Sequence, residues 1–97
     1  MNRLSPLTLL IVTLWTRAQS WPPAARARLP ELRALVTHHR LPCPAREHDA
    51  IEPDPRTLRR LLETACVWGE LRLLPDLTWA LELLVCDLEH DARRSAL

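Results

Sequence analysis

The chain has 97 residues, a formal net charge of +1 at pH 7 and a hydrophobic content of 47%. It contains one Gly, no Phe and no Tyr, whereas sheets depend on β-branched and aromatic side chains and hairpin turns depend on Gly. The composition therefore argues against a sheet. It predicts a single all-α domain over residues 1–97, with one core of modest size.

Proline placement and apolar periodicity predict a small bundle of about four main helices. Proline is tolerated in the first turn of a helix but breaks its interior, so each of four prolines marks a helix start. The last two helices are separated by a short turn, which favours an antiparallel C-terminal helical hairpin. The predicted helices cover residues 6–18, 30–40, 55–72 and 76–92, and a Pro-rich connection covers residues 41–54.

The first predicted helix is apolar nearly all round, since Leu9 and Val12 fall outside the face that its other apolar residues share. Such a helix is either buried, part of an interface, or a targeting signal. Arg3, the apolar run after it and the small residues at 18–20 also fit a secretory signal. Pro6 and the Ser and Thr interruptions oppose that reading. We therefore expect a cytoplasmic protein, with secretion as the alternative and no membrane span.

A short helical turn is expected at residues 24–28, followed by a break, because Pro30 would clash with the carbonyl of Arg26. The second main helix then buries Leu29, Leu32 and its later apolar residues. The connection at residues 41–54 holds four prolines if Pro55 is counted with it. Such a stretch is either a functional loop or a plain crossover between helix pairs.

Charge placement supports the antiparallel hairpin. Arginines crowd the N-terminus of the third helix and acids crowd the C-terminus of the fourth, which in both cases is unfavourable for the helix dipole. If the two helices fold back on each other at residue 74, Arg59 lies beside Glu89 and the arginine cluster lies beside the acidic cluster. The inward side chains are predicted to be Thr57, Leu58, Leu61, Leu62, Ala65, Trp68 and Gly69 on one helix and Leu77, Ala80, Leu81, Leu84, Leu88 and Ala92 on the other. Because Gly is unfavourable inside a helix, Gly69 lies either close to the helix end or at a site of close packing.

Metal and catalytic sites are weakly indicated. Cys86 and His90 lie one helical turn apart, and Cys43, His48 or the His38-His39 pair could complete a tetrahedral zinc site. No close pair of cysteines accompanies them, and no motif fixes a nucleophile beside a base. Three unpaired cysteines favour a reducing compartment over a disulfide framework. We therefore predict no metal, no cofactor and no enzymatic activity.

The strongest functional signal is a second stripe on the fourth helix, formed by Trp79, Leu83, Cys86 and His90. We call these four residues the outer stripe, because they lie roughly opposite the inward stripe of the same helix. Val67 and Leu71 are predicted to extend it. Either the first two helices cover this face, or it contacts another protein molecule. The prediction is a non-enzymatic protein–protein interaction or assembly module, as a homo-oligomer or as a subunit of a larger complex.

A nucleic-acid-binding regulator is the alternative. All 13 basic residues are Arg, and Arg side chains bind phosphate through paired hydrogen bonds. Arg26, Arg28, Arg33 and Arg40 would form a basic strip if they shared one face. The acids that follow Pro75 oppose this alternative, because they repel phosphate.

Overall fold

The structure is a computed structural model that describes residues 5–41 and 54–95. All regular secondary structure within these ranges is helical, which confirms the all-α prediction. The predicted Pro-rich connection lies outside the described residues except for its two ends. The helices are α1 (Pro6–Thr16), the 3₁₀ helix η1 (Ala18–Ser20), α2 (Pro23–Arg26), α3 (Leu29–His38), α4 (Pro55–Val67) and α5 (Pro75–Ser95).

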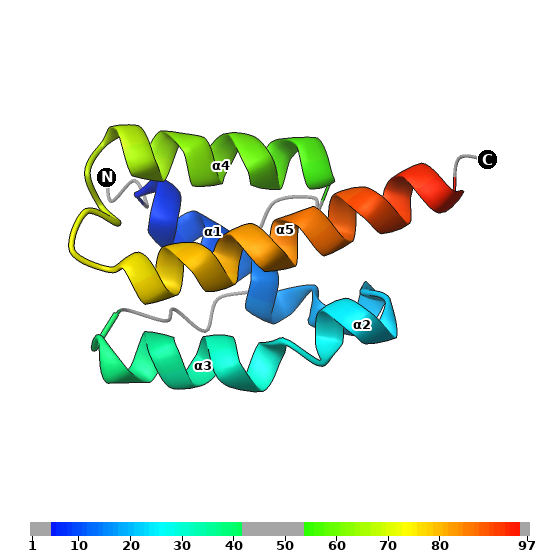
Figure 1. The fold of residues 1–97 in the computed structure, drawn as a ribbon, viewed down its shortest axis with the longest axis horizontal. Helices are drawn as coiled ribbons and strands as arrows, with labels where there is room; N and C mark the ends of the chain where they lie inside the picture. The colour runs from blue at the N-terminus through cyan, green and yellow to red at the C-terminus, as the bar shows by residue number, and fades with distance from the viewer. Residues whose placement is uncertain (1–4, 42–53, 96–97) are drawn as a thin grey trace.

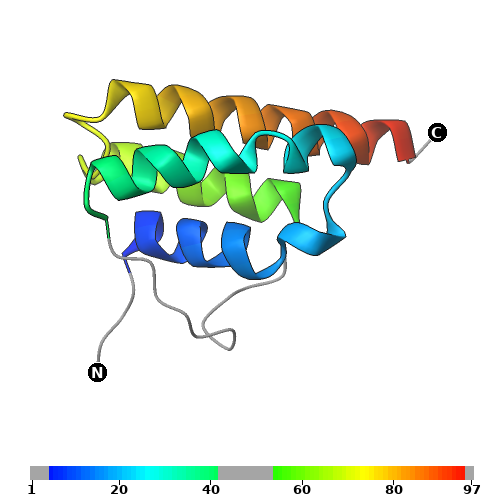
Figure 2. The same ribbon diagram turned by 90° about the horizontal axis from the view of Figure 1, so that it is seen from below.

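The helices are arranged so that α5 occupies one edge of the molecule. In Figure 1, α5 runs between α4 and α3, and both of these run in the opposite direction to α5. Figure 2 shows α1 on the side remote from α5. One side of α5 therefore packs against its neighbours, while the other side faces outward.

The core is built mainly from leucines. From α1, the side chains of Leu10, Ile11, Val12 and Leu14 are all 0–1% exposed, which explains why this helix is apolar nearly all round. Each fully buried side chain of this size stabilises the fold by roughly 1.5–3 kcal/mol. The inward leucines predicted on α4 and α5 are also buried, apart from the partly buried Leu61; the buried ones are Leu58, Leu62, Leu77, Leu81, Leu84 and Leu88.

Two helix starts follow the predicted pattern in different ways. Ser5 precedes Pro6, and its hydroxyl accepts a hydrogen bond from the backbone N–H of Thr8 at 3.2 Å. Asp54 occupies the N-cap position of α4, where the residue type favours a hydrogen bond from an unpaired backbone N–H to the carboxylate. Its carboxylate instead accepts from the Thr57 hydroxyl at 3.3 Å and does not cap a backbone N–H.

The end of α4 differs most from the prediction, because the helix stops at Val67 and not at residue 72. Gly69 adopts φ +79°, a left-handed conformation that ends helices. The N–H of Gly69 donates to the Cys66 carbonyl at 3.1 Å and the N–H of Glu70 to the Ala65 carbonyl at 3.0 Å. These two bonds form a Schellman motif, so Gly69 has the helix-ending role that its position allows.

The C-terminus of α3 uses the same geometry without a glycine. Arg40 has φ +55°, and the N–H of Leu41 donates to the Val36 carbonyl at 3.1 Å. Leu41 also packs against the core that contains Val36, and a hydrophobic contact of this kind commonly accompanies the motif. The helix therefore ends at His38, two residues before the predicted boundary.

The four main helices start within one residue of the predicted positions, and the two remaining helix ends differ by two or three residues. α1 ends at Thr16, short of residue 18, and α5 extends to Ser95, past residue 92. Across the described ranges, 5–41 and 54–95, no helix combines the length and the apolar content needed to cross a bilayer.

Candidate interaction surface

The outer stripe lies on the exposed side of α5. Trp79 is 66% exposed, Cys86 and His90 are exposed, and Leu83 is partly buried. The inward leucines of α5 are 0–7% exposed. The periodicity therefore separates the two faces correctly for the leucines. The inward prediction for Ala92 was wrong: Ala92 is exposed, because the last turns of α5 extend past the start of α4 (Figure 1). The described helices α1–α3 do not cover Trp79.

The predicted extension of the outer stripe onto Val67 and Leu71 needs correction. Val67 is 84% exposed, whereas Leu71 is 5% exposed and belongs to the core. The prediction assumed that both residues share a helix face four positions apart. Because α4 ends at Val67, Leu71 lies in the following turn, and its side chain packs inward.

The exposed large apolar side chains gather at one end of the molecule. Among the described residues they are Val67, Trp68, Leu73 and Trp79, with exposed fractions of 66–84%. All four fall between the end of α4 and the second turn of α5. Sequence reasoning placed Trp68 on the inward side and overlooked Leu73. A helix end at Gly69 was the signal that would have placed both in or next to a turn.

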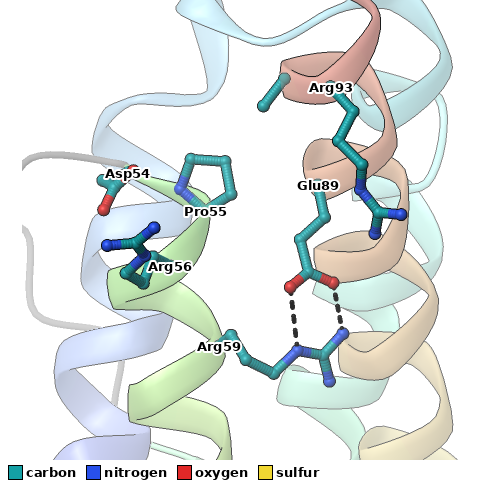
Figure 3. A pocket seen from close by; sticks show the side chains of 7 residues that line it. Asp54, Pro55, Arg56, Arg59, Glu89 and Arg93 are labelled. Carbon is teal, nitrogen blue, oxygen red and sulfur yellow. Dashed lines mark hydrogen bonds and ion pairs between the residues drawn. The ribbon is translucent and has the colours of Figure 1, made fainter.

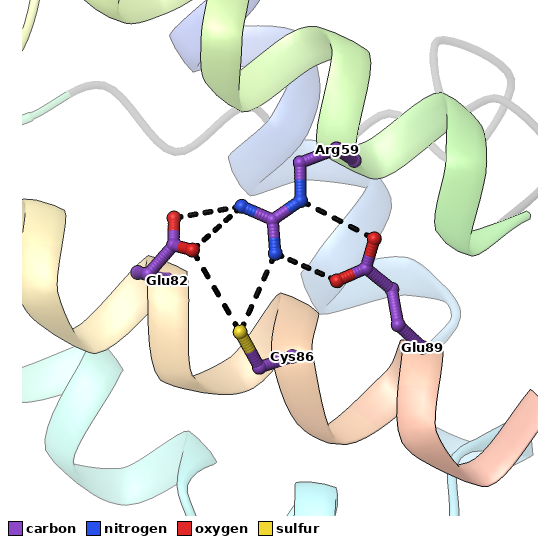
Figure 4. A network of polar contacts seen from close by, with 4 residues as sticks. All are labelled: Arg59, Glu82, Cys86 and Glu89. Carbon is purple, nitrogen blue, oxygen red and sulfur yellow. Dashed lines mark hydrogen bonds and ion pairs between the residues drawn. The ribbon is translucent and has the colours of Figure 1, made fainter.

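A polar network joins α4 to α5 along one flank of the outer stripe (Figure 4). The Arg59 guanidinium donates to Glu89 Oε1 at 2.6 Å and to Glu82 Oε1 at 2.7 Å. It also lies 3.4 Å from the Cys86 sulfur, and the Cys86 thiol is 3.7 Å from Glu82. Arg59 and Glu89 were predicted to lie side by side on the two antiparallel helices, and the structure shows them in direct contact.

The network shifts the ionisation of its members. Hydrogen bonding to Glu89 and Glu82 raises the pKa of Arg59, although desolvation opposes the shift. The hydrogen bond from Arg59 lowers the pKa of Glu89, helped by its charge and that of Arg93. Both groups are therefore held in their charged forms at neutral pH.

A surface pocket of about 550 Å³ lies beside this network, between the start of α4 and the last turns of α5. In Figure 3, the Arg59–Glu89 pair spans the gap between the two helices at one end of the pocket. Because Arg59 holds Glu89 as a carboxylate, Glu89 is poorly suited to donate a proton near neutral pH. The lining residues are Asp54, Pro55, Arg56, Arg59, Glu89, Ala92 and Arg93.

The opposite flank of α5 is tied to the N-terminal half of the chain. The Arg28 guanidinium donates to the Asp87 carboxylate, and His39 Nε2 lies 3.0 Å from Asp76 Oδ1. Desolvation tends to raise the pKa of Asp76, but hydrogen bonds from the Leu77 N–H and His39 lower it overall. Ion pairs thus hold α5 on both sides of the outer stripe.

The four arginines predicted for nucleic acid do not point the same way. Arg28 faces Asp87 on α5, whereas the Arg33 guanidinium lies 5.6 Å from the ring centre of Trp15 on α1. Because α1 and α5 lie on opposite sides of α3 in Figure 2, these two side chains diverge. Arg26 and Arg40 are exposed. The geometry gives little support to a continuous basic strip.

The residues considered for zinc are also dispersed. Cys86 and His90 are exposed on α5, and His39 pairs with Asp76. Cys43 and His48 lie outside the described residues. Within residues 5–41 and 54–95, no group of three or more His, Cys, Asp and Glu side chains is placed to hold a metal ion.

Comparison with known proteins adds no relative. No protein-family model matches the sequence, and the comparisons with curated proteins and with solved structures found no match. The function has therefore to be argued from the geometry of α5 and its surroundings.

Proposed function

We propose that this chain is a small helical bundle whose α4–α5 hairpin binds protein through the outer stripe of α5. The observation that carries the proposal is the 66% exposure of Trp79 on a helix whose opposite face is buried. Trp is the residue type that most often dominates the energy of protein interfaces. Val67, Trp68 and Leu73 add exposed apolar surface at the same end of the hairpin.

The ion pairs beside α5 also support this proposal. Arg59 joins α4 to Glu82 and Glu89 on one flank, and Arg28 joins the N-terminal half to Asp87 on the other. Exposed ion pairs of this kind each contribute only about 0–1 kcal/mol to stability. Their effect here is to fix the orientation of the outer stripe, and a pre-ordered surface loses less entropy when it binds.

The test compares Leu83→Glu with Ala34→Glu, which adds the same charge to an exposed position on α3. Light scattering at several concentrations measures self-association, and chemical cross-linking in extract detects other protein partners. We expect Leu83→Glu to abolish association while leaving the melting temperature close to that of the wild type. Ala34→Glu should leave both unchanged. Unaltered association together with a large drop in melting temperature would place Leu83 in the monomer core and refute the proposal.

Nucleic-acid binding by the Arg-rich N-terminal half remains the less supported alternative. Arg28 is committed to Asp87. Arg33 is exposed but lies over Trp15, and Arg26 and Arg40 are exposed as well. Retention on DNA that falls steeply with added salt would favour this alternative.

A further inference from the structure

We propose that the protein bound by the outer stripe is a second copy of this chain, with the two α5 helices packed antiparallel. This inference rests on the proposed function, because it names the partner of the same surface. It is carried by the spacing along α5 and by the charges at the two ends of that spacing.

The spacing is that of a two-stranded coiled coil. Continuing the spacing of the outer stripe by one position at each end reaches Asp76, at its edge toward α3, and Arg93, at its edge toward α4. The six positions are separated by three, four, three, four and three residues. This is the heptad pattern of positions that face a partner helix. The order of these spacings is the same from either end of α5. In an antiparallel pair, each of the six positions therefore lies opposite one of the six positions of the second copy. With 21 residues, α5 is about 31 Å long and accommodates the whole pattern.

The end charges select the antiparallel direction. Antiparallel pairing sets Trp79 against His90 of the second copy and Leu83 against Cys86 of the second copy. The outermost layers then pair Asp76 of each copy with Arg93 of the other, which are opposite charges. A parallel pair would place Asp76 against Asp76 and Arg93 against Arg93, and would repel at both ends. The Asp76 side chain is 48% exposed despite its contact with His39, so it remains accessible.

The flanks of the outer stripe do not oppose such a pair. On the α4 side, Arg59 contacts both Glu82 and Glu89 and offsets part of their charge. On the α3 side, Arg28 balances Asp87. A surface with nearly zero net charge can meet its own copy without repulsion, whereas a strongly charged surface could not.

The position of α5 leaves room for a second helix. Figure 2 shows α5 along one edge of the molecule, with α1 on the remote side and α3 and α4 between them. The direction of the outer stripe is away from all three neighbours, because the opposite face of α5 carries the buried leucines. A helix laid along the outer stripe therefore meets α5 first.

A disulfide trap tests both the partner and its direction. The background chain carries Cys43→Ser and Cys66→Ser, so Cys86 is its only thiol. A second chain in the same background carries Leu83→Cys and Cys86→Ser, so that each chain has one thiol and no disulfide can close within a chain. Mixing the two chains places the thiol at position 83 opposite Cys86 of the other copy in the antiparallel pair. Mild oxidation should then give a covalent dimer in which position 83 is bridged to Cys86, as read by mass spectrometry after digestion. The matched control is Ala34→Cys, which alters an exposed position on α3 and should give at least about tenfold less dimer.

Substitution of Arg93 tests the antiparallel pair independently, because it changes the strength of dimerisation and needs no oxidant. Arg93→Glu sets two acids together at each end layer and should weaken dimerisation about fivefold or more, whereas Arg93→Lys should leave it nearly unchanged. Bridges chiefly between the two copies of position 83 would overturn the antiparallel direction. A chain that stays monomeric at every concentration would overturn the second copy as partner. If the chain is monomeric but Leu83→Glu removes the binding of a different protein, the proposed function holds and only the identity of the partner is wrong. If the chain is monomeric and Leu83→Glu affects no binding, the proposed function is wrong as well.

Discussion

Within residues 5–41 and 54–95, two residues with positive φ end helices, and only one of them is Gly. Gly69 has φ +79° and Arg40 has φ +55°. A side chain strains the left-handed conformation by roughly 1–2 kcal/mol, whereas Gly adopts it freely. The same backbone geometry is thus relaxed at the end of α4 and strained at the end of α3.

Replacing Gly69 by Ala should lower the free energy of unfolding by about 1 kcal/mol. A Cβ built at this position meets no atom within 4 Å, so the loss would come from backbone strain and not from a clash. Urea unfolding followed by circular dichroism measures the change. Gly69→Asn is the control and should cost less, because Asn tolerates this conformation. An unchanged midpoint for Gly69→Ala would contradict the strain argument.

Arg40→Gly should have the opposite sign and raise the unfolding free energy by about 0.5–1 kcal/mol. The larger entropy of Gly in the unfolded chain offsets part of the gain. The same urea experiment measures it, with Arg40→Ala as the control that removes the side chain and keeps the strain. Stabilisation by both variants would point to removal of the Arg charge as the cause.

The Glu89 carboxylate should make stability depend on pH in the acid range. Arg59 lowers the pKa of Glu89 below its ordinary value of 4.5. A carboxyl group whose pKa is lower in the folded state contributes stability above its unfolded pKa, and that stability is lost as the pH falls through the folded pKa. We therefore expect the unfolding free energy to decline below about pH 4.5. Glu89→Gln should flatten that decline and cost about 1 kcal/mol or less at pH 7, as measured by urea titrations between pH 2 and pH 7. An equally steep decline in Glu89→Gln would assign the effect to other carboxylates.

At the scale of the elements, the turn after α4 is tied to the start of α1. The Glu70 carboxylate accepts a hydrogen bond from the backbone N–H of Leu7 at 3.2 Å. Leu7 lies in the first turn of α1, where backbone N–H groups lack partners within the helix and the dipole favours an acid. One side chain thus caps a helix that lies 63 residues away in the sequence.

Glu70→Ala should destabilise the fold by about 0.5–2 kcal/mol, since it leaves this N–H without its partner. Glu70→Gln keeps an acceptor oxygen and removes the charge, so it should cost less. Thermal unfolding of the three chains measures both changes. Glu63→Ala serves as a control, because Glu63 is an exposed acid on α4. A loss for Glu63→Ala as large as that for Glu70→Ala would remove the argument for a specific cap.

The sequence predicted the elements better than their ends. Helix starts at Pro6 and Pro55 and the two faces of α5 follow from local rules, namely proline geometry and a period of 3.6 residues. The end of α4 depends on the conformation of one Gly, and the prediction ran past it. That single error placed Leu71 on the surface and Trp68 in the interior.

Contacts between distant segments were predictable only where charge made them so. Arg59 and Glu89 could be matched because unfavourable clusters at two helix ends are reconciled by one antiparallel arrangement. The pairing of Arg28 with Asp87 and the cap of Leu7 by Glu70 carry no such local signal. They arise from how α1, α2 and α3 pack onto the other two helices, which periodicity alone does not determine.

At the scale of the whole molecule, burial and exposure are divided across one helix. The leucines on one face of α5 join the core supplied by α1, α3 and α4. The outer stripe remains on the other face because α5 lies at the edge of the molecule (Figure 2). Folding and association should therefore depend on different residues of the same helix.

Leu81 and Leu83 provide the sharpest comparison, because they lie two residues apart on α5 and differ in burial. Leu81 is 0% exposed, whereas Leu83 is partly buried on the outer stripe. Leu81→Ala should cost about 2–5 kcal/mol of unfolding free energy, as expected for a buried leucine. Leu83→Ala should cost less than about 1.5 kcal/mol in a dilute, monomeric sample.

Association should depend more on Leu83 than on Leu81, the reverse of the order expected for stability. In the folded state, Leu81→Ala leaves the outer stripe intact, so its dissociation constant by analytical ultracentrifugation should stay within about threefold of the wild type. Leu83→Ala removes a central contact and should raise that constant about tenfold, which corresponds to about 1.4 kcal/mol. Equal effects of the two substitutions on both quantities would mean that α5 does not separate folding from association, and that Leu83 belongs functionally to the core.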